Sequence, residues 1–149
     1  MKKVVLAFIF LLAGCTSTTS HTTSTFSDPM GIIKAAADSA PKGVPGQYTL
    51  QIVATGSQGQ YVYLNTEKDY RDQRAVTVAL HPNVIAQLSA KYGMPPQEYF
   101  LNKAVVVNGK AQRVKIAFLS DGKPTGKYYY QTHVRVMDIS QLKVVDEHA

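Results

Sequence analysis

The sequence predicts a mostly β domain in which three strands, one helix and two further strands follow one another. Two patterns indicate this order. From Tyr48 onward, apolar side chains recur at every second position in several separate stretches, which is typical of strands with one buried face. Between Pro82 and Tyr92 they recur instead at helical spacing. A chain of 149 residues has room for one such domain.

Three strands are expected before the helix. The first covers residues 48–55 and ends at a turn of glycine and polar residues, 56–59. The second covers residues 61–64. A polar stretch, 65–74, separates it from the third strand at 76–80, where apolar residues again occupy alternate positions.

The helix is expected over residues 82–92. Pro82 suits the first turn of a helix, because the amide hydrogen that proline lacks would have no partner there. Gly93 suits the position just after the last turn. Two prolines then open the stretch 95–100, which is expected to be irregular or a single helical turn.

Two strands are expected after the helix. The fourth covers residues 104–118, with a bend at an Asn-Gly pair in its middle. A loop rich in glycine and proline, 120–127, leads to the fifth strand at 128–136. The last apolar run, 142–145, is interpreted as a continuation of that strand beyond a bulge.

Two stretches, 102–109 and 134–144, resemble the last two strands of the oligonucleotide/oligosaccharide-binding (OB) fold. Asn102 stands where that fold usually has glycine. The resemblance covers 48–145 and implies an all-β fold with one helix, a five-stranded Greek-key barrel whose helix lies between strands 3 and 4. The chain is also similar to periplasmic lipoproteins with this barrel. That similarity implies no activity. Another small β-barrel or an α+β sheet is the competing architecture.

The first fourteen residues are interpreted as a signal peptide. Lys2 and Lys3 precede an apolar run at 4–12, which is too short to span about 30 Å of hydrocarbon. The ending Leu-Ala-Gly-Cys, 12–15, resembles the lipobox of bacterial lipoproteins, which implies cleavage before Cys15 and lipid on its thiol. The alternative is an ordinary secretory signal with an incidental cysteine. Cys15 is the single cysteine of the chain, so it has no intramolecular disulfide partner.

The chain behind the signal peptide divides into a tether and a domain. Residues 15–46 are expected to form the lipidated cysteine and a flexible tether, because 16–25 is almost entirely serine and threonine. A short helix within 26–40 is compatible with the pattern, and prolines and glycines break the chain at 41–46. The OB-fold-like domain is then expected at 47–149.

The lipoprotein resemblance also implies a location. Thr16 after the cysteine favours the outer membrane, with the domain facing the periplasm, and two or more acyl chains make such an anchor durable. Cleavage would remove Lys2 and Lys3, so sixteen basic residues become fourteen against ten acidic ones, a net charge of +4. This surplus only weakly favours anionic partners.

Acidic and basic residues alternate in the polar stretch 65–74. Its carboxylates are Glu67, Asp69 and Asp72, and its cations are Lys68, Arg71 and Arg74. A calcium loop would need a central glycine and an excess of carboxylates, and neither is present. A solvated hairpin with internal ion pairs is therefore favoured over a partner-contacting loop, and both are favoured over a metal site.

Aromatic and basic residues gather in the last two strands. Alternation places Tyr129, Gln131, His133 and Arg135 on one outer face, and Arg113 and Lys115 are expected to share it. Such a face suits stacking on bases or sugar rings. The alternative is purely structural, because aromatic residues are enriched in strands. The preceding loop, 120–127, has the wrong order for a phosphate-binding loop, and no helix follows it.

The sequence predicts no catalytic centre, metal or cofactor. Its histidines, His21, His81, His133 and His148, are dispersed rather than set at metal-ligand spacing. A Gly-x-Ser-x-Gly nucleophile elbow is absent from the sequence, and the cysteine is assigned to lipid.

The expected function is therefore that of a non-catalytic binding or assembly module for a periplasmic protein or glycan. Single-stranded nucleic-acid binding through the OB-like face is the first alternative, and a hydrolase of unknown substrate is the second. The residues predicted to contact the ligand are Tyr61, Tyr63, Arg71, Arg113, Lys123, Lys127, Tyr129 and His133.

Overall fold

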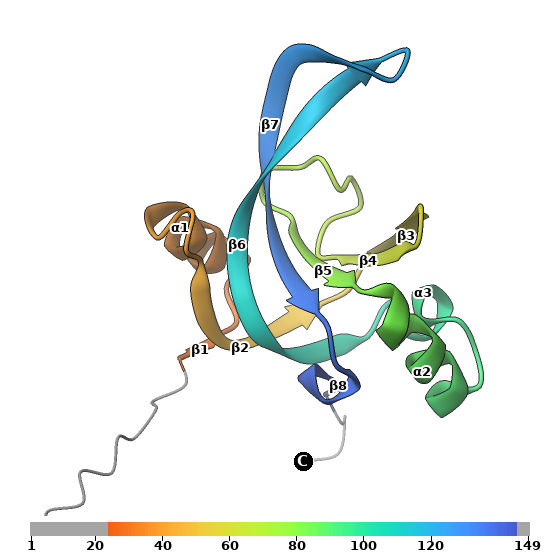
Figure 1. The fold of residues 1–149 in the computed structure, drawn as a ribbon. Helices are drawn as coiled ribbons and strands as arrows, with labels where there is room; N and C mark the ends of the chain where they lie inside the picture. Colours follow the sequence, from red (N-terminus) through yellow and green to blue (C-terminus); the bar gives the residue numbers. More distant parts are fainter. Residues whose placement is uncertain (1–23, 146–149) are drawn as a thin grey trace, which may run out of the picture.

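A computed structural model describes residues 24–145 (Figure 1). Their strands are β1 (Thr25–Phe26), β2 (Val44–Gln51), β3 (Ala54–Gln58), β4 (Tyr61–Asn65), β5 (Val76–Leu80), β6 (Ala104–Ser120), β7 (Lys123–Val136) and β8 (Leu142–Val144). Their helices are α1 (Pro29–Asp38), α2 (Pro82–Tyr92), α3 (Pro96–Tyr99) and a 3₁₀ turn (Ile139–Gln141). The predicted signal peptide and Cys15 lie outside the described residues. None of the described helices is long and apolar enough to cross a membrane.

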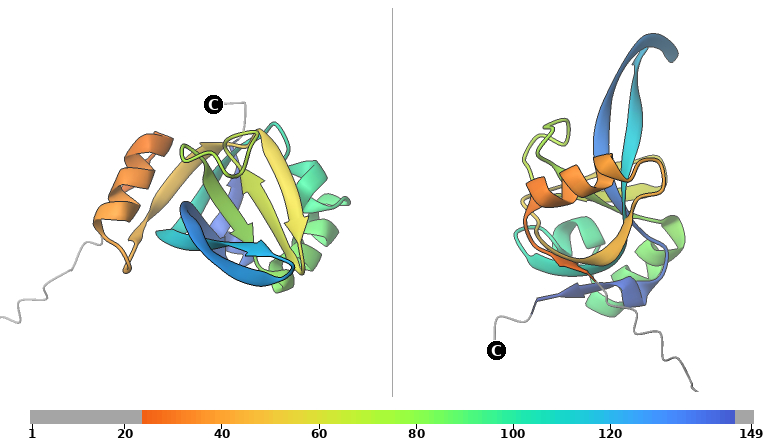
Figure 2. Two further views of the ribbon diagram at one scale, coloured as in Figure 1. Left: turned by 90° about the horizontal axis from the view of Figure 1, so that it is seen from above. Right: turned by 90° about the vertical axis from the view of Figure 1, so that its left-hand side faces the viewer.

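All strands belong to one mixed sheet in the order β1-β2-β6-β7-β5-β4-β3, with β8 paired to β6. The pairing of β5 with β7 is parallel, and those of β6 with β2 and β7 are antiparallel. The helix α2 follows the third expected strand and precedes the fourth, as predicted. This order confirms an OB-fold-like arrangement, in which the sheet curls strongly (Figure 2).

The predicted five-stranded Greek-key barrel is not what the structure contains. The expected first strand is divided into β2 and β3, because the chain changes partner between them. The Ile52 amide donates to the Lys103 carbonyl, beside β6, and the Val53 amide donates to the Asn65 carbonyl in β4, both at 2.9 Å. With β1 and β8 added, the result is an eight-stranded sheet whose hydrogen-bonded path has two ends.

The core confirms the alternation expected for the strands. Tyr48, Leu50 and Ile52 are fully buried, while Thr49 and Gln51 between them are not. The inner faces of the other strands contribute Val62, Leu64, Val76, Val78, Leu80, Val105, Val107, Val134 and Val136. Val84 and Leu88 of α2 pack against the same cluster. The helix ends as predicted at Gly93, whose φ of 72° is left-handed and whose amide donates to the Ser89 carbonyl.

The structure corrects the domain boundary predicted at 46. Asp28 caps α1 by accepting hydrogen bonds from the amides of Met30 and Gly31. Ile32 and Ala36 of this helix are fully buried in the core, and β1 pairs with β2. The part of the expected tether that is described therefore belongs to the folded domain, and the rest of it, 15–23, lies outside the described residues.

The expected loop 120–127 is instead a tight hairpin. Asp121 and Gly122 have φ values of 50° and 75°, the positive pair found in two-residue hairpin turns. Strand β2 pairs with β6 only as far as Ala111, and β5 pairs with β7 only from Thr132. Residues 112–131 therefore form a two-stranded ribbon, the β6–β7 arm, which projects beyond the sheet (Figures 1 and 2).

Candidate functional site

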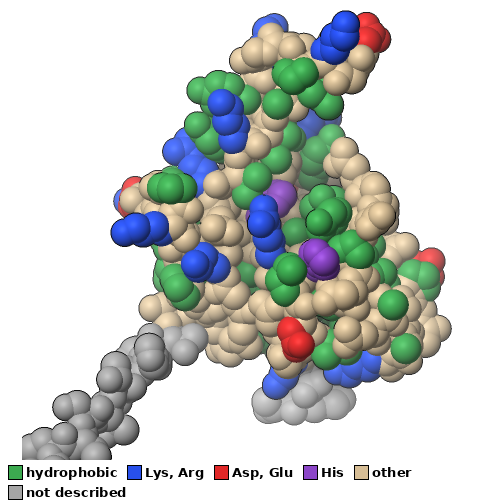
Figure 3. Space-filling view, in the orientation of Figure 1, with side chains coloured by type: hydrophobic (Ala, Val, Ile, Leu, Met, Phe, Trp, Pro, Cys, Tyr) green, Lys and Arg blue, Asp and Glu red, His purple; other side chains and the backbone are tan. Residues whose placement is uncertain are grey.

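Four rings form a row on the outer face of the sheet. Tyr61 and Tyr63 point outward from β4, His133 from β7, and His81 lies between β5 and α2. Ring centroids are 5.6 Å apart for His81 and Tyr61, 6.3 Å for Tyr61 and Tyr63, and 6.1 Å for Tyr63 and His133. We call this set the aromatic row. The two histidines of the described chain, purple in Figure 3, mark its ends.

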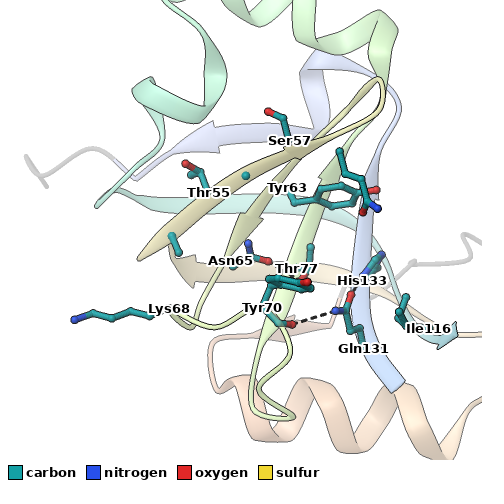
Figure 4. A pocket seen from close by; sticks show the side chains of 13 residues that line it. Thr55, Ser57, Tyr63, Asn65, Lys68, Tyr70, Thr77, Ile116, Gln131 and His133 are labelled. Atoms are coloured by element: carbon teal, nitrogen blue, oxygen red, sulfur yellow. Dashed lines mark hydrogen bonds between the residues drawn. The ribbon is translucent and has the colours of Figure 1, made fainter. Parts of the chain in front are cut away.

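A pocket of about 350 Å³ lies beside the aromatic row (Figure 4). Most of its polar lining is hydroxyl or amide: Thr55, Ser57, Gln58, Asn65, Thr77 and Gln131. The lining also contains three rings, those of Tyr63, Tyr70 and His133, and the cation of Lys68. No Asp or Glu is among the residues that line this pocket, which we call the outer pocket.

A hydrogen-bond network holds the wall of the outer pocket. The Gln131 amide nitrogen donates to the Tyr70 carbonyl at 3.1 Å and to the Tyr129 hydroxyl at 2.9 Å. Because the amide oxygen of Gln131 can only accept, His133 Nε2, which lies 2.6 Å from it, carries the hydrogen. This network fastens the 65–74 loop to β7. On the floor, the Thr77 hydroxyl donates to Asn65 Oδ1 at 2.8 Å.

The imidazole of His133 is uncharged at neutral pH. Burial lowers its pKa to about 4, and the nearby positive charge of Arg135 adds to this shift. His133 therefore acts at the pocket as a neutral hydrogen-bonding ring and not as a cation.

The 65–74 loop has the internal ion pairs expected from its sequence. Arg71 Nε lies 3.1 Å from Asp69 Oδ1, and Arg74 Nη2 lies 2.7 Å from Asp72 Oδ2. Hydrogen bonds from Arg74 lower the pKa of the Asp72 carboxyl to about 2. Within residues 24–145, no three His, Cys, Asp or Glu side chains are grouped in a way that could hold a metal ion.

The prediction that Arg113 and Lys115 share a face with His133 is wrong. In the antiparallel register Arg113 lies opposite Thr132, and Lys115 lies opposite Tyr130. Directly opposed residues point to the same side, so both cations accompany Tyr128 and Tyr130 instead. The two-residue turn and the register shift between Ala117 and Leu119 together set this register, and a change of one residue would exchange the faces.

The predicted contact residues therefore fall into separate groups. Tyr63 and His133 line the outer pocket, and Tyr61 continues the aromatic row. Arg71 and Tyr129 lie near them but are occupied by Asp69 and by Gln131. The remaining three are on the β6–β7 arm: Arg113, Lys123 and Lys127. Whether any of them binds a ligand stays a prediction.

Sequence reasoning missed most of the polar lining of the outer pocket. Thr77 was on the outward side of an expected strand, so alternation could have indicated it. Asn65 and Tyr70 were assigned to a solvated loop, and nothing in the local pattern indicates that this loop folds back onto β7. Thr55 was at the end of the first strand, beyond its apolar residues, and Ser57 was in the expected turn that follows it.

Comparison with protein-family models finds no match, and comparison with curated proteins finds none either. Among solved structures, the chain is similar to a putative aspartyl-tRNA synthetase from Leishmania major Friedlin, with 13% identity and a TM-score of 0.45. It is also similar to the aspartyl-tRNA synthetase from Entamoeba histolytica, with 13% identity and a TM-score of 0.44. These alignments cover 87% and 97% of this chain but only 22% and 28% of those enzymes.

Proposed function

We propose that this chain is a non-catalytic binding module whose outer pocket and aromatic row bind a glycan. The observation that carries this proposal is the row of rings beside a pocket lined by hydroxyls and amides. The apolar face of a sugar ring packs on tyrosine, and its hydroxyls exchange hydrogen bonds with such groups. Faces of OB-like domains are known to accept oligosaccharides as well as oligonucleotides.

The charge of the outer pocket favours a neutral ligand. Lys68 is the single cation among its lining residues. A nucleic acid would place a phosphate at each nucleotide, and affinity for it comes largely from several lysine or arginine contacts. A neutral glycan needs no such contacts.

The non-catalytic part of the proposal rests on the same lining. Bond cleavage needs a nucleophile, acid or base within reach of the ligand. In this pocket His133 is a buried neutral ring held by Gln131, and no carboxylate or thiol stands next to it among the lining residues. No observation favours the hydrolase alternative.

Single-stranded nucleic acid is the second candidate ligand. It is favoured by Arg135, which is exposed next to His133 on β7, and by two lysines near the tip of the arm, Lys123 and Lys127. Stacking of bases on tyrosine and salt-dependent phosphate contacts would be its signature.

We further propose that lipid on Cys15 anchors the module to the outer membrane, facing the periplasm. The leader pattern supports this. Residue 24, where the described chain begins, lies at the end of the molecule away from the tip of the arm (Figures 1 and 2).

The mass of the protein purified from cells tests the anchor. A mature chain that starts at an acylated cysteine is expected, and Cys15→Ser should leave the protein unlipidated and outside the membrane fraction. An unacylated mature chain of the wild type would contradict the anchor, the location and the choice of periplasmic partners.

Titration of the full-length chain tests the ligand. A β-1,4-linked N-acetylglucosamine oligosaccharide is expected to bind with the same Kd at about 50 and 200 mM salt, whereas binding of oligothymidylate would weaken steeply over that range. Tyr63→Ala should weaken glycan binding by about 1–3 kcal/mol, the magnitude found for a base stacked on an aromatic side chain. Tyr128→Ala, on the arm, is the matched control. Salt-sensitive oligothymidylate binding that depends on Tyr63, without glycan binding, would establish the second candidate.

A further inference from the structure

The β6–β7 arm has a second surface that the outer pocket does not use. Arg113 and Lys115 point from β6 to the side where Tyr128 and Tyr130 point from β7. The Arg113 guanidinium carbon lies 3.6 Å from the centre of the Tyr130 ring, and Lys115 Nζ lies 4.1 Å from the centre of the Tyr128 ring. We call these four residues the cationic face.

The cations of the arm have no acidic partner. The ion pairs found in residues 24–145 are Lys34–Asp38, Arg71–Asp69 and Arg74–Asp72, none of which lies on the arm. The arm carries Arg113, Lys115, Lys123 and Lys127 against the single carboxylate of Asp121. Contact with a ring orients a cation but does not neutralise its charge, so the arm has an uncompensated positive charge.

A second hollow of about 350 Å³ adjoins the cationic face. Ile33 and Ala37 of α1 line one side of it, and Tyr128, Tyr130 and Arg113 of the arm line the other. The hollow is thus bounded by apolar side chains and rings, by the Arg113 guanidinium, and by the polar side chains of Gln73 and Thr132. In Figure 3, blue cations lie next to green side chains along the arm.

The edges of the arm are poorly suited to receive another strand. Lys123, Pro124 and Lys127 lie along β7 near the tip, and the register shifts between Ala117 and Leu119 of β6. Lysine, proline and such irregularities are the features that protect exposed strand edges from pairing. A partner is therefore expected at the face of the arm. A second copy of this chain would bring like charges together, which disfavours self-association.

We infer that the cationic face and the adjoining hollow form a docking site for an acidic segment of a partner protein. A carboxylate of that segment would accept hydrogen bonds from both outer nitrogens of Arg113, whose guanidinium carbon lies 3.6 Å from the centre of the Tyr130 ring. An apolar side chain next to the carboxylate would enter the hollow beside Ile33. This site goes beyond the proposed glycan binding, because it lies on other residues and recognises another chemistry.

The same contacts disfavour a nucleic acid at this face. Stacking of a base needs an open ring face. Arg113 already covers one face of Tyr130, and Lys115 covers one face of Tyr128. A carboxylate needs only the outer edge of the guanidinium, which stacking leaves accessible.

Fluorescence anisotropy on the full-length chain tests this inference. The probe is a labelled, amidated peptide of glutamates around one phenylalanine, and its matched control has glutamine at every glutamate position. The acidic peptide is expected to bind and the glutamine peptide is not. Arg113→Gln should weaken binding about tenfold, the effect of one charge-assisted hydrogen-bond pair. Arg113→Lys keeps the charge but loses the paired donors, so it should also weaken binding.

Two controls separate this site from the proposed glycan site. Lys143→Gln removes an exposed lysine of β8 away from the arm and should leave peptide binding unchanged, as should Tyr63→Ala. Equal binding of both peptides, or peptide binding that is insensitive to Arg113→Gln, would overturn the inference. Binding of oligothymidylate in place of the acidic peptide would overturn it too. So would a dimer in sedimentation that Arg113→Gln dissociates, since the face would then join two copies.

Discussion

Replacing Ile32 by alanine is expected to lower the free energy of unfolding by about 2–4 kcal/mol. Ile32 lies on α1, is 0% exposed, and packs into the central core. Truncation to alanine removes its buried methyl and methylene groups and leaves a cavity that the neighbouring side chains fill only in part. Urea unfolding of the full-length chain, followed by circular dichroism, measures the change.

Met30 provides the control for Ile32, because it lies on the same helix and is 52% exposed. Met30→Ala should change the free energy of unfolding by no more than about 0.5 kcal/mol. Equal effects of the two substitutions would show that α1 does not pack on the domain. Residues 24–46 would then behave as the tether expected from the sequence.

Acidification is expected to destabilise the fold through His133 by up to about 3 kcal/mol. Its pKa is about 4 in the folded protein and 6.5 in the unfolded chain. Between these values the unfolded state binds more protons than the folded state, so stability falls as pH falls. The contribution is complete above pH 6.5 and is lost by about pH 4, below which both states are protonated. Its size follows from about 1.36 kcal/mol per pKa unit.

Unfolding of the wild type and of His133→Gln across pH 4–7.5 measures this contribution. The variant has no group that titrates at this position, so the difference in free energy of unfolding between the two proteins should change with pH in this window. The carboxylates whose pKa values are lowered, including Asp69 and Asp72, titrate mainly below it. A pH-independent difference would show that His133 is not held neutral by burial.

The hydrogen bonds of Gln131 connect the protonation of His133 to the wall of the outer pocket. A charged His133 would keep its hydrogen bond to Gln131 but would place a buried positive charge beside Arg135. The wall of the outer pocket, which Gln131 holds to Tyr70, would then open more readily. Glycan binding is therefore tested near pH 7, where the His133 ring is neutral in the folded protein.

The periodicity of the sequence determined where most of the elements lie. Alternation in 48–52 and 76–80 places the inward residues of these strands correctly, and α2 begins and ends where Pro82 and Gly93 indicate. These features depend on neighbours one to four positions apart, so a single sequence contains the information. The Asp-Gly pair at 121–122 is also a local hairpin signal, although a loop was expected there.

Only the tertiary structure decided which strands, loops and side chains from distant parts of the sequence lie next to one another. The division of the first strand into β2 and β3 depends on the carbonyls of Lys103 and Asn65, and the outer pocket depends on the 65–74 loop folding onto β7. The side on which Arg113 lies depends on the pairing register of β6 and β7. The burial of α1 depends on a surface made by strands far along the chain. Such contacts join residues separated by tens of positions, and no pattern within one stretch of sequence specifies them.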